Sequence, residues 1–121
     1  MKRTVVFYRT PSGCPFEHFL DSLPGRIVKK ITWVLSAIED LDGAAELFFK
    51  TAESGEGIME CHIACKDAVF RILSFYQGRV MVVLWGGLSV KFQGMLAEQL
   101  ERAIRYKNDF LVRKGKHERC G

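Results

Sequence analysis

The chain has 121 residues, of which 48% are hydrophobic and 26% are charged, and its formal net charge is +4 at pH 7. This length is typical of one domain, and this composition excludes a wholly disordered chain. The longest uninterrupted apolar run, residues 80–85, is far shorter than the roughly 20 residues of a membrane-spanning helix. No apolar segment of the secretory type follows the N-terminus. We therefore expect a single cytoplasmic domain over residues 1–121 that does not enter a membrane.

The basic residues are concentrated at the two ends of the chain. Residues 1–30 carry six Lys or Arg against two acidic residues, and residues 98–121 carry seven against four. Residues 31–97 carry five against eight and are therefore net acidic. This distribution suits a polyanionic partner such as nucleic acid, and solvated helix faces would produce the same distribution.

The first predicted elements are a strand and two helices. Residues 4–8 are rich in β-branched and aromatic side chains and predict a strand, which Pro11-Ser12-Gly13 ends. A short helix is predicted over residues 15–21. A longer helix begins at Pro24, carries apolar residues at helical spacing, and ends at Asp42-Gly43.

The second half of the chain predicts four strands and a final helix. The strands cover residues 47–51, 58–65, 68–76 and 79–86, and the helix covers residues 95–114. Gly115 is expected to end this helix, with a disordered tail over residues 115–121. The element order is β-α-α-β-β-β-β-α. It predicts an α+β fold in which a small, antiparallel-rich sheet is covered on one face by helices.

Two predicted turns determine which side chains of the sheet lie side by side. A two-residue turn at Lys66-Asp67 places His62 opposite Arg71, and one at Gln77-Gly78 places Leu84 opposite Arg71 on the other side. One face of the sheet is then the core. Its predicted members are Met59, Cys61, Ile63, Cys65, Phe70, Ile72, Met81, Val83 and Trp85.

The opposite face carries Glu60, His62 and Arg71 among apolar neighbours, and it allows two interpretations. In the first, the three form a satisfied polar network in which Glu60 pairs diagonally with Arg71 and His62 lies beside them. In the second, they form a phosphodiester site. Arg71 would donate two parallel hydrogen bonds to phosphate, and His62 would exchange a proton near neutral pH.

The cysteines are expected to be reduced and free of metal. Cys14, Cys61, Cys65 and Cys120 show no paired C-x-x-C spacing. On an extended strand Cys61 and Cys65 would be about 13 Å apart, beyond the reach of a disulfide. Their place on the core face favours hydrophobic packing over metal ligation. We therefore expect no metal and no cofactor.

Three segments carry a resemblance to a known family. They are TVVFYRTPSGCPFEHFLDSLP, GEGIMECHIACKDAVFRILSFYQGR and EQLERAIRYKNDFLVRKG. Together they resemble the phage-derived, HigB-like branch of the RelE toxin superfamily, over most of the chain from Thr4 to Lys114. The resemblance implies a RelE-like fold, whose element order matches the one above. It also implies a toxin of a type II toxin-antitoxin system: a metal-independent endoribonuclease that cleaves mRNA on the ribosome, inhibits translation and is neutralised by a helix-turn-helix antitoxin.

The resemblance also implies roles for individual residues. Glu60 matches the acidic residue of the family's Glu-x-Arg strand, and Arg71 matches the arginine of its Tyr-Arg-Ile strand. Lys91 and Gln93 match the second lysine and the glutamine of a Lys-Lys-Thr-Gln-Lys-Thr-Pro stretch. Lys50 matches the first lysine of a Lys-Lys-Leu-Lys stretch.

Together with His62, whose role rests on its own chemistry, these matches divide the predicted site into a catalytic and an RNA-binding group. The catalytic residues are His62, Arg71 and Lys91, and the RNA-binding residues are Lys50, Glu60 and Gln93. His62 would be a general base or acid, while Arg71 and Lys91 would stabilise the pentacoordinate phosphorane. Tyr106 is a weaker candidate, because a helix tyrosine at the edge of an apolar stripe more often packs.

Five positions depart from the family pattern. His62 stands where the family usually has arginine, and Thr51, Glu53, Val90 and Gly94 stand where it usually has lysine. Each lost lysine removes a phosphate contact and some of the attraction to RNA. A histidine can still serve a ribonuclease, because attack by the 2′-hydroxyl needs a base and an acid. The alternative is a catalytically weakened protein on the same fold, acting as a protein- or RNA-binding module.

Overall fold

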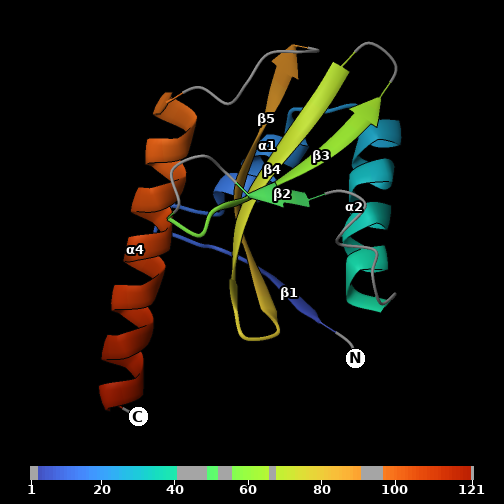
Figure 1. Ribbon diagram of the computed structural model, residues 1–121. Coiled ribbons are helices and arrows are strands. Elements are labelled where there is room, and N and C mark those ends of the chain that lie inside the picture. The colour runs from blue at the N-terminus through green and yellow to red at the C-terminus, as the bar shows by residue number, and fades with distance from the viewer. Residues whose placement is uncertain (1–2, 41–48, 52–55, 66–67, 91–96, 121) are drawn as a thin grey trace.

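The computed structural model describes residues 3–40, 49–51, 56–65, 68–90 and 97–120 (Figure 1). Its elements are β1 (Thr4–Phe7), α1 (Pro15–Asp21), α2 (Gly25–Asp40), β2 (Phe49–Thr51), β3 (Met59–Cys65), β4 (Ala68–Gln77), β5 (Val80–Val90) and α4 (Ala97–Cys120). The described elements follow the predicted order.

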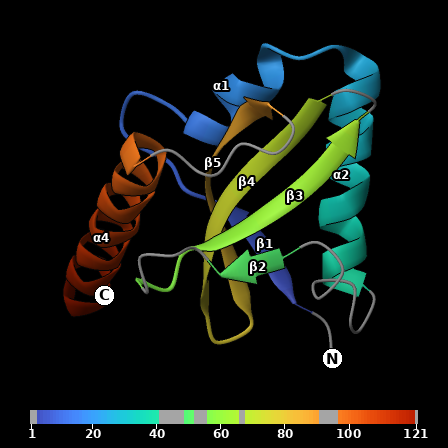
Figure 2. The ribbon, with the colours of Figure 1, turned by 45° about the horizontal axis from the view of Figure 1, so that its top comes forward.

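The strands form one five-stranded sheet in the order β1-β5-β4-β3-β2. Strands β2, β3, β4 and β5 pair antiparallel with their neighbours, whereas β1 pairs parallel with β5. Figure 2 shows the long strands β3, β4 and β5 side by side, with the short β2 at one edge. The expectation of an α+β fold with an antiparallel-rich sheet is confirmed.

One face of the sheet packs against α1 and α2. Helix α2 buries Ile31, Val34, Leu35 and Ile38, whose spacing places them on one side of a helix. They belong to a core cluster that also contains Cys61, Ile63, Phe70, Ile72, Met81 and Val83 from the sheet, as predicted. Burial of this apolar face supplies most of the stability of such a helix.

The other face of the sheet packs against α4, so the prediction that helices cover one face only is wrong. A second cluster joins Leu73, Phe75 and Val82 of the sheet to Ala103 of α4, with Leu100, Ile104 and Phe110 packed against it. Figure 1 shows α4 on the opposite side of the sheet from α2. The apolar stripe of α4 therefore packs on the face of the sheet opposite to the one that α1 and α2 cover.

Helix α4 continues through Gly115 to Cys120, so the predicted end at Gly115 is wrong. One glycine inside a helix costs only about 1 kcal/mol relative to alanine, and the basic residues on both sides of Gly115 favour the C-terminal part of a helix. Among the described helices, none is long and apolar enough to cross a membrane.

The predicted register between β3 and β4 is confirmed. Cys65 lies opposite Ala68, and His62 lies opposite Arg71. The predicted register between β4 and β5 is wrong, because Gln77 pairs with Val80 and the two-residue turn is Gly78-Arg79. Gly78 has φ of 59°, a conformation that favours glycine.

A β-bulge moves the register of β5 once more. Between Leu73 and Ser74 the pairing shifts, so that Leu73 lies opposite Trp85 and Arg71 lies opposite Gly87 rather than Leu84. The shift also places Trp85 with the α4 cluster. The prediction that Trp85 lies on the face covered by α1 and α2 is therefore wrong.

Candidate functional site

Glu60, His62 and Arg71 meet on the sheet face that lies away from α1 and α2. The Glu60 carboxylate oxygen Oε1 accepts a hydrogen bond from Arg71 Nη1 and lies 3.0 Å from His62 Nε2. Glu60 and His62 alternate along β3, so they point to the same face, and His62 is the register partner of Arg71. The diagonal pairing of Glu60 with Arg71 was predicted, and it is confirmed.

Burial divides the three side chains into a supporting pair and an accessible member. The side chains of Glu60 and Arg71 are 4% and 9% exposed, whereas that of His62 is 31% exposed. A buried carboxylate is stable only when it is paired and hydrogen-bonded. Arg71 supplies this pairing, and the imidazole is the group that solvent or a ligand can reach.

The carboxylate also determines how the imidazole is oriented. Glu60 can only accept hydrogen bonds when it is ionised, so the neutral His62 carries its proton on Nε2. The other ring nitrogen, Nδ1, is then the basic one. A carboxylate that holds one nitrogen of a histidine and leaves the other free to accept a proton is the arrangement used in general acid-base catalysis.

The start of α4 borders this site. A side chain at Gly87, the register partner of Arg71, would lie 3.6 Å from Nε2 of Gln99 and 3.7 Å from the ring of Trp85. Arg102 lies over the same ring, 5.0 Å from its centroid. Trp85 and the first turns of α4 therefore form one side of the site.

The remaining predicted residues are placed only in part. Lys50 and Thr51 lie on β2, where Lys50 is the register partner of Glu60, and Val90 is the last residue of β5. Lys91 and Gln93, and the departures Glu53 and Gly94, lie outside the described residues. Tyr106 stacks on Tyr8, with ring centroids 4.9 Å apart, in agreement with the packing role expected for it.

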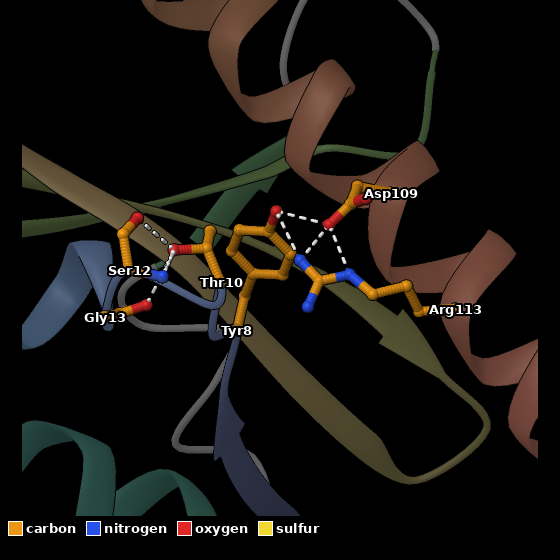
Figure 3. A network of polar contacts seen from close by, with 6 residues as sticks. All are labelled: Tyr8, Thr10, Ser12, Gly13, Asp109 and Arg113. Atoms are coloured by element: carbon orange, nitrogen blue, oxygen red, sulfur yellow. Dashed lines mark hydrogen bonds and ion pairs between the residues drawn. The ribbon is translucent and has the colours of Figure 1, made fainter.

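A second polar cluster, which the sequence did not predict, joins Tyr8, the residue after β1, to α4 (Figure 3). The buried Tyr8 donates its hydroxyl proton to Asp109 Oδ2 at 2.6 Å, and Arg113 binds both Asp109 and the Tyr8 hydroxyl. Burial, together with the bond to Asp109, raises the pKa of Tyr8 to about 12. The hydrogen bonds from Arg113 and Tyr8 lower the pKa of Asp109. Asp109 and Arg113 stand one helical turn apart, but Tyr8 is distant in the sequence.

The side chains of the described cysteines belong to the core on the other face of the sheet. Cys14, Cys61 and Cys65 are free, and burial raises the pKa of the Cys61 thiol to about 12. Such a thiol is unreactive at neutral pH. Within the ranges that the structure describes, no three His, Cys, Asp or Glu residues are grouped so that they could hold a metal ion.

Comparison with known proteins adds no support to the resemblance to the HigB-like toxins, which is based only on the residues quoted above. No protein-family model matches the chain, and no curated protein matches it significantly.

Proposed function

We propose that this chain is the toxin of a type II toxin-antitoxin system, with a RelE-like fold, and that it cleaves ribosome-bound mRNA in the cytoplasm. The observation that carries the proposal is the Glu60–His62 pair. His62 is 31% exposed on a sheet face, and its Nε2 lies 3.0 Å from a carboxylate that is itself buried. This gives an accessible imidazole whose Nε2 is held by a buried carboxylate.

The chemistry would be an intramolecular displacement that uses groups of the RNA itself. His62 Nδ1 takes the proton of the ribose 2′-hydroxyl, and the 2′ oxygen attacks the adjacent phosphorus. The bond from phosphorus to the 5′ oxygen breaks, and this oxygen takes a proton from the imidazolium. The products are a 2′,3′-cyclic phosphate and a 5′-hydroxyl end, and His62 returns to its neutral form. No metal or cofactor enters this sequence of steps.

Arg71 is a positioning residue in this proposal. Its side chain is 9% exposed, and its guanidinium binds the Glu60 carboxylate and holds it beside His62. This differs from the expected direct role of Arg71 on the phosphorane. The charge on the transition state would then be stabilised by Lys91, with Lys50 and Gln93 on the flanking RNA, as the resemblance implies. A helix-turn-helix antitoxin would be the neutralising partner.

Induced expression in a bacterial host tests the toxin function. We expect growth arrest within a generation, together with new mRNA ends that carry 2′,3′-cyclic phosphates. Growth arrest without new mRNA ends would refute the ribonuclease activity, and normal growth with intact mRNA would refute the toxin function altogether.

The burial of the ion pair favours a second candidate, a non-catalytic binding module. Glu60 and Arg71 neutralise each other inside the sheet, and four positions that usually carry lysine in the family do not. Stable binding of the chain to ribosomes, without growth arrest or cleavage, would support this candidate.

A further inference from the structure

A cavity of about 310 Å³ lies between the turn that joins β1 to α1 and residues Arg102 and Tyr106 of α4. Its polar lining consists of Thr10, Ser12, Gly13, His18, Arg102 and Tyr106. None of the residues assigned to RNA cleavage contributes to it. The lining contains cationic and hydroxyl groups and no carboxylate.

The turn that forms one wall is held by its own hydrogen bonds. Thr10 and Gly13 exchange two backbone hydrogen bonds, of 2.7 Å and 3.0 Å. The Thr10 hydroxyl lies 3.0 Å from the Ser12 hydroxyl and accepts a bond from the Ser12 amide, as Figure 3 shows. A wall fixed in this way loses little conformational freedom when a ligand binds.

His18 is placed on this wall by a glycine. Gly13 has φ of 140°, and a Cβ atom there would lie only 2.9 Å from two atoms of the His18 ring. The imidazole therefore packs directly over the glycine backbone, where any other residue would displace it. His18 is otherwise exposed, so its ring borders the cavity and remains accessible.

The other wall is formed by two residues one helical turn apart on α4. The Arg102 guanidinium lies over the Trp85 ring, 5.0 Å from its centroid, and Tyr106 stacks on Tyr8. Both contacts engage the faces of the groups and leave their edges able to donate hydrogen bonds. Among the described residues, no carboxylate forms an ion pair with Arg102.

We propose that this cavity binds the phosphate group of a small phosphate monoester, such as a nucleoside 5′-monophosphate. Arginine matches the geometry of phosphate with two parallel hydrogen bonds. Ser12, His18 and Tyr106 bring further donors from both walls, which suits the three terminal oxygens of a monoester better than the two of a carboxylate. The volume lies at the lower end of the range for small-molecule sites, about 300–1,000 Å³, and leaves room for an organic group beside the phosphate.

Titration of the ¹⁵N-labelled chain with a nucleoside 5′-monophosphate, followed by amide NMR, tests the site. At constant ionic strength we expect saturable shifts at Ser12, Gly13, His18, Arg102 and Tyr106, and weaker binding of inorganic phosphate at the same amides. Absence of saturable shifts, or shifts centred on His62 and Arg71 instead, would overturn the proposal. Tighter binding of inorganic phosphate would overturn the assignment to a monoester.

A pair of arginine variants provides the matched control. Arg102→Gln should weaken binding of the nucleotide about tenfold or more, because it removes a charge-assisted contact. Arg105→Gln changes an exposed arginine of the same helix that does not line the cavity, and it should leave affinity unchanged. Equal affinities of the two variants would contradict the proposal.

Arg102→Gln also removes the contact of Arg102 with the Trp85 ring, so a third variant that leaves the packing intact is needed. Tyr106→Phe retains the ring that stacks on Tyr8 and removes only the hydroxyl. It should weaken binding several-fold without changing the unfolding midpoint. Unchanged affinity in a folded Tyr106→Phe variant would remove Tyr106 from the site and contradict the two-walled arrangement. None of these measurements depends on RNA cleavage, so the outcome is separate from that of the proposed ribonuclease.

Discussion

Glu60 and Arg71 occupy diagonal positions on neighbouring strands, and the buried carboxylate of Glu60 accepts a hydrogen bond from the guanidinium of Arg71. Both side chains are more than nine-tenths buried. The pair is therefore part of the sheet's internal structure as well as the support of His62. Any substitution in it is expected to act on stability and on the site together.

Arg71→Ala should destabilise the fold by about 3–5 kcal/mol, because it leaves the Glu60 charge buried without its partner. Glu60→Ala should have a similar effect, and the double variant should be less destabilised than the two single effects together. Urea unfolding of the four proteins measures this coupling. Full additivity of the two substitutions would contradict the pairing.

Gly86→Ala should destabilise the fold by about 1–3 kcal/mol through overpacking. A Cβ at Gly86 would lie 2.7 Å from the ring of Phe19 and 3.1 Å from Ile72 Cδ1, inside the core between α1 and β5. Thermal unfolding measures the effect. Gly25→Ala is the matched control, since nothing lies within 4 Å of a Cβ there, and it should be neutral or stabilising. A neutral Gly86→Ala would show that α1 does not pack against β5 as closely as described.

The contribution of the Tyr8–Asp109 hydrogen bond to the free energy of unfolding should decrease at alkaline pH. Folding raises the pKa of Tyr8 from 10.0 to about 12, so it favours the neutral phenol. This contribution to stability is complete below pH 10 and is lost as the pH rises towards 12. The difference in unfolding free energy between the wild type and Tyr8→Phe should therefore be constant up to pH 10 and decrease above it.

The dependence of stability on Asp109 at acidic pH provides the control. Folding lowers the pKa of Asp109 from 3.8, so its contribution is present above that value and is lost as the pH falls through the lowered one. Asp109→Asn should differ from the wild type at neutral pH and approach it in strong acid. A Tyr8→Phe difference that stays constant through pH 12 would contradict the hydrogen-bonded cluster.

Local sequence signals were sufficient to predict the part of the site that lies on one hairpin. A two-residue connection at Lys66-Asp67 leaves one register for the two strands, and a slip of one residue would move every side chain of one strand to the other face. That register brings His62 opposite Arg71 and Glu60 diagonal to it, as observed.

The neighbouring hairpin shows what such signals cannot supply. Gln77-Gly78 and Gly78-Arg79 both contain the glycine that a tight turn requires, and the observed turn is the second. The bulge between Leu73 and Ser74 is a property of the assembled sheet that neither turn indicates in the sequence. Because of these two shifts, the residue opposite Arg71 is Gly87 and not the predicted Leu84.

Contacts between distant parts of the chain could also not be predicted from the sequence. The spacing of Asp109 and Arg113 identifies an ion pair on α4, but only the packing of α4 across β5 brings Tyr8 to it. The same packing forms the cavity between Gly13 and Arg102. The apolar stripe of the last helix predicted that one side of this helix would be buried. It did not identify the face of the sheet against which the helix packs.

The ribonuclease proposal is tested most directly by the rate at which purified protein cleaves ribosome-bound mRNA, measured for the wild type, His62→Gln and His117→Gln. Glutamine retains a polar side chain at the partly exposed position 62 but cannot transfer a proton, so cleavage should fall by about 10²–10⁴-fold with an unchanged unfolding midpoint. His117 stands near the end of α4 and has no assigned role in cleavage, so His117→Gln should cleave as the wild type does. Equal cleavage by the two variants, or no cleavage by the wild type, would contradict the assignment of His62 as the group that transfers the proton.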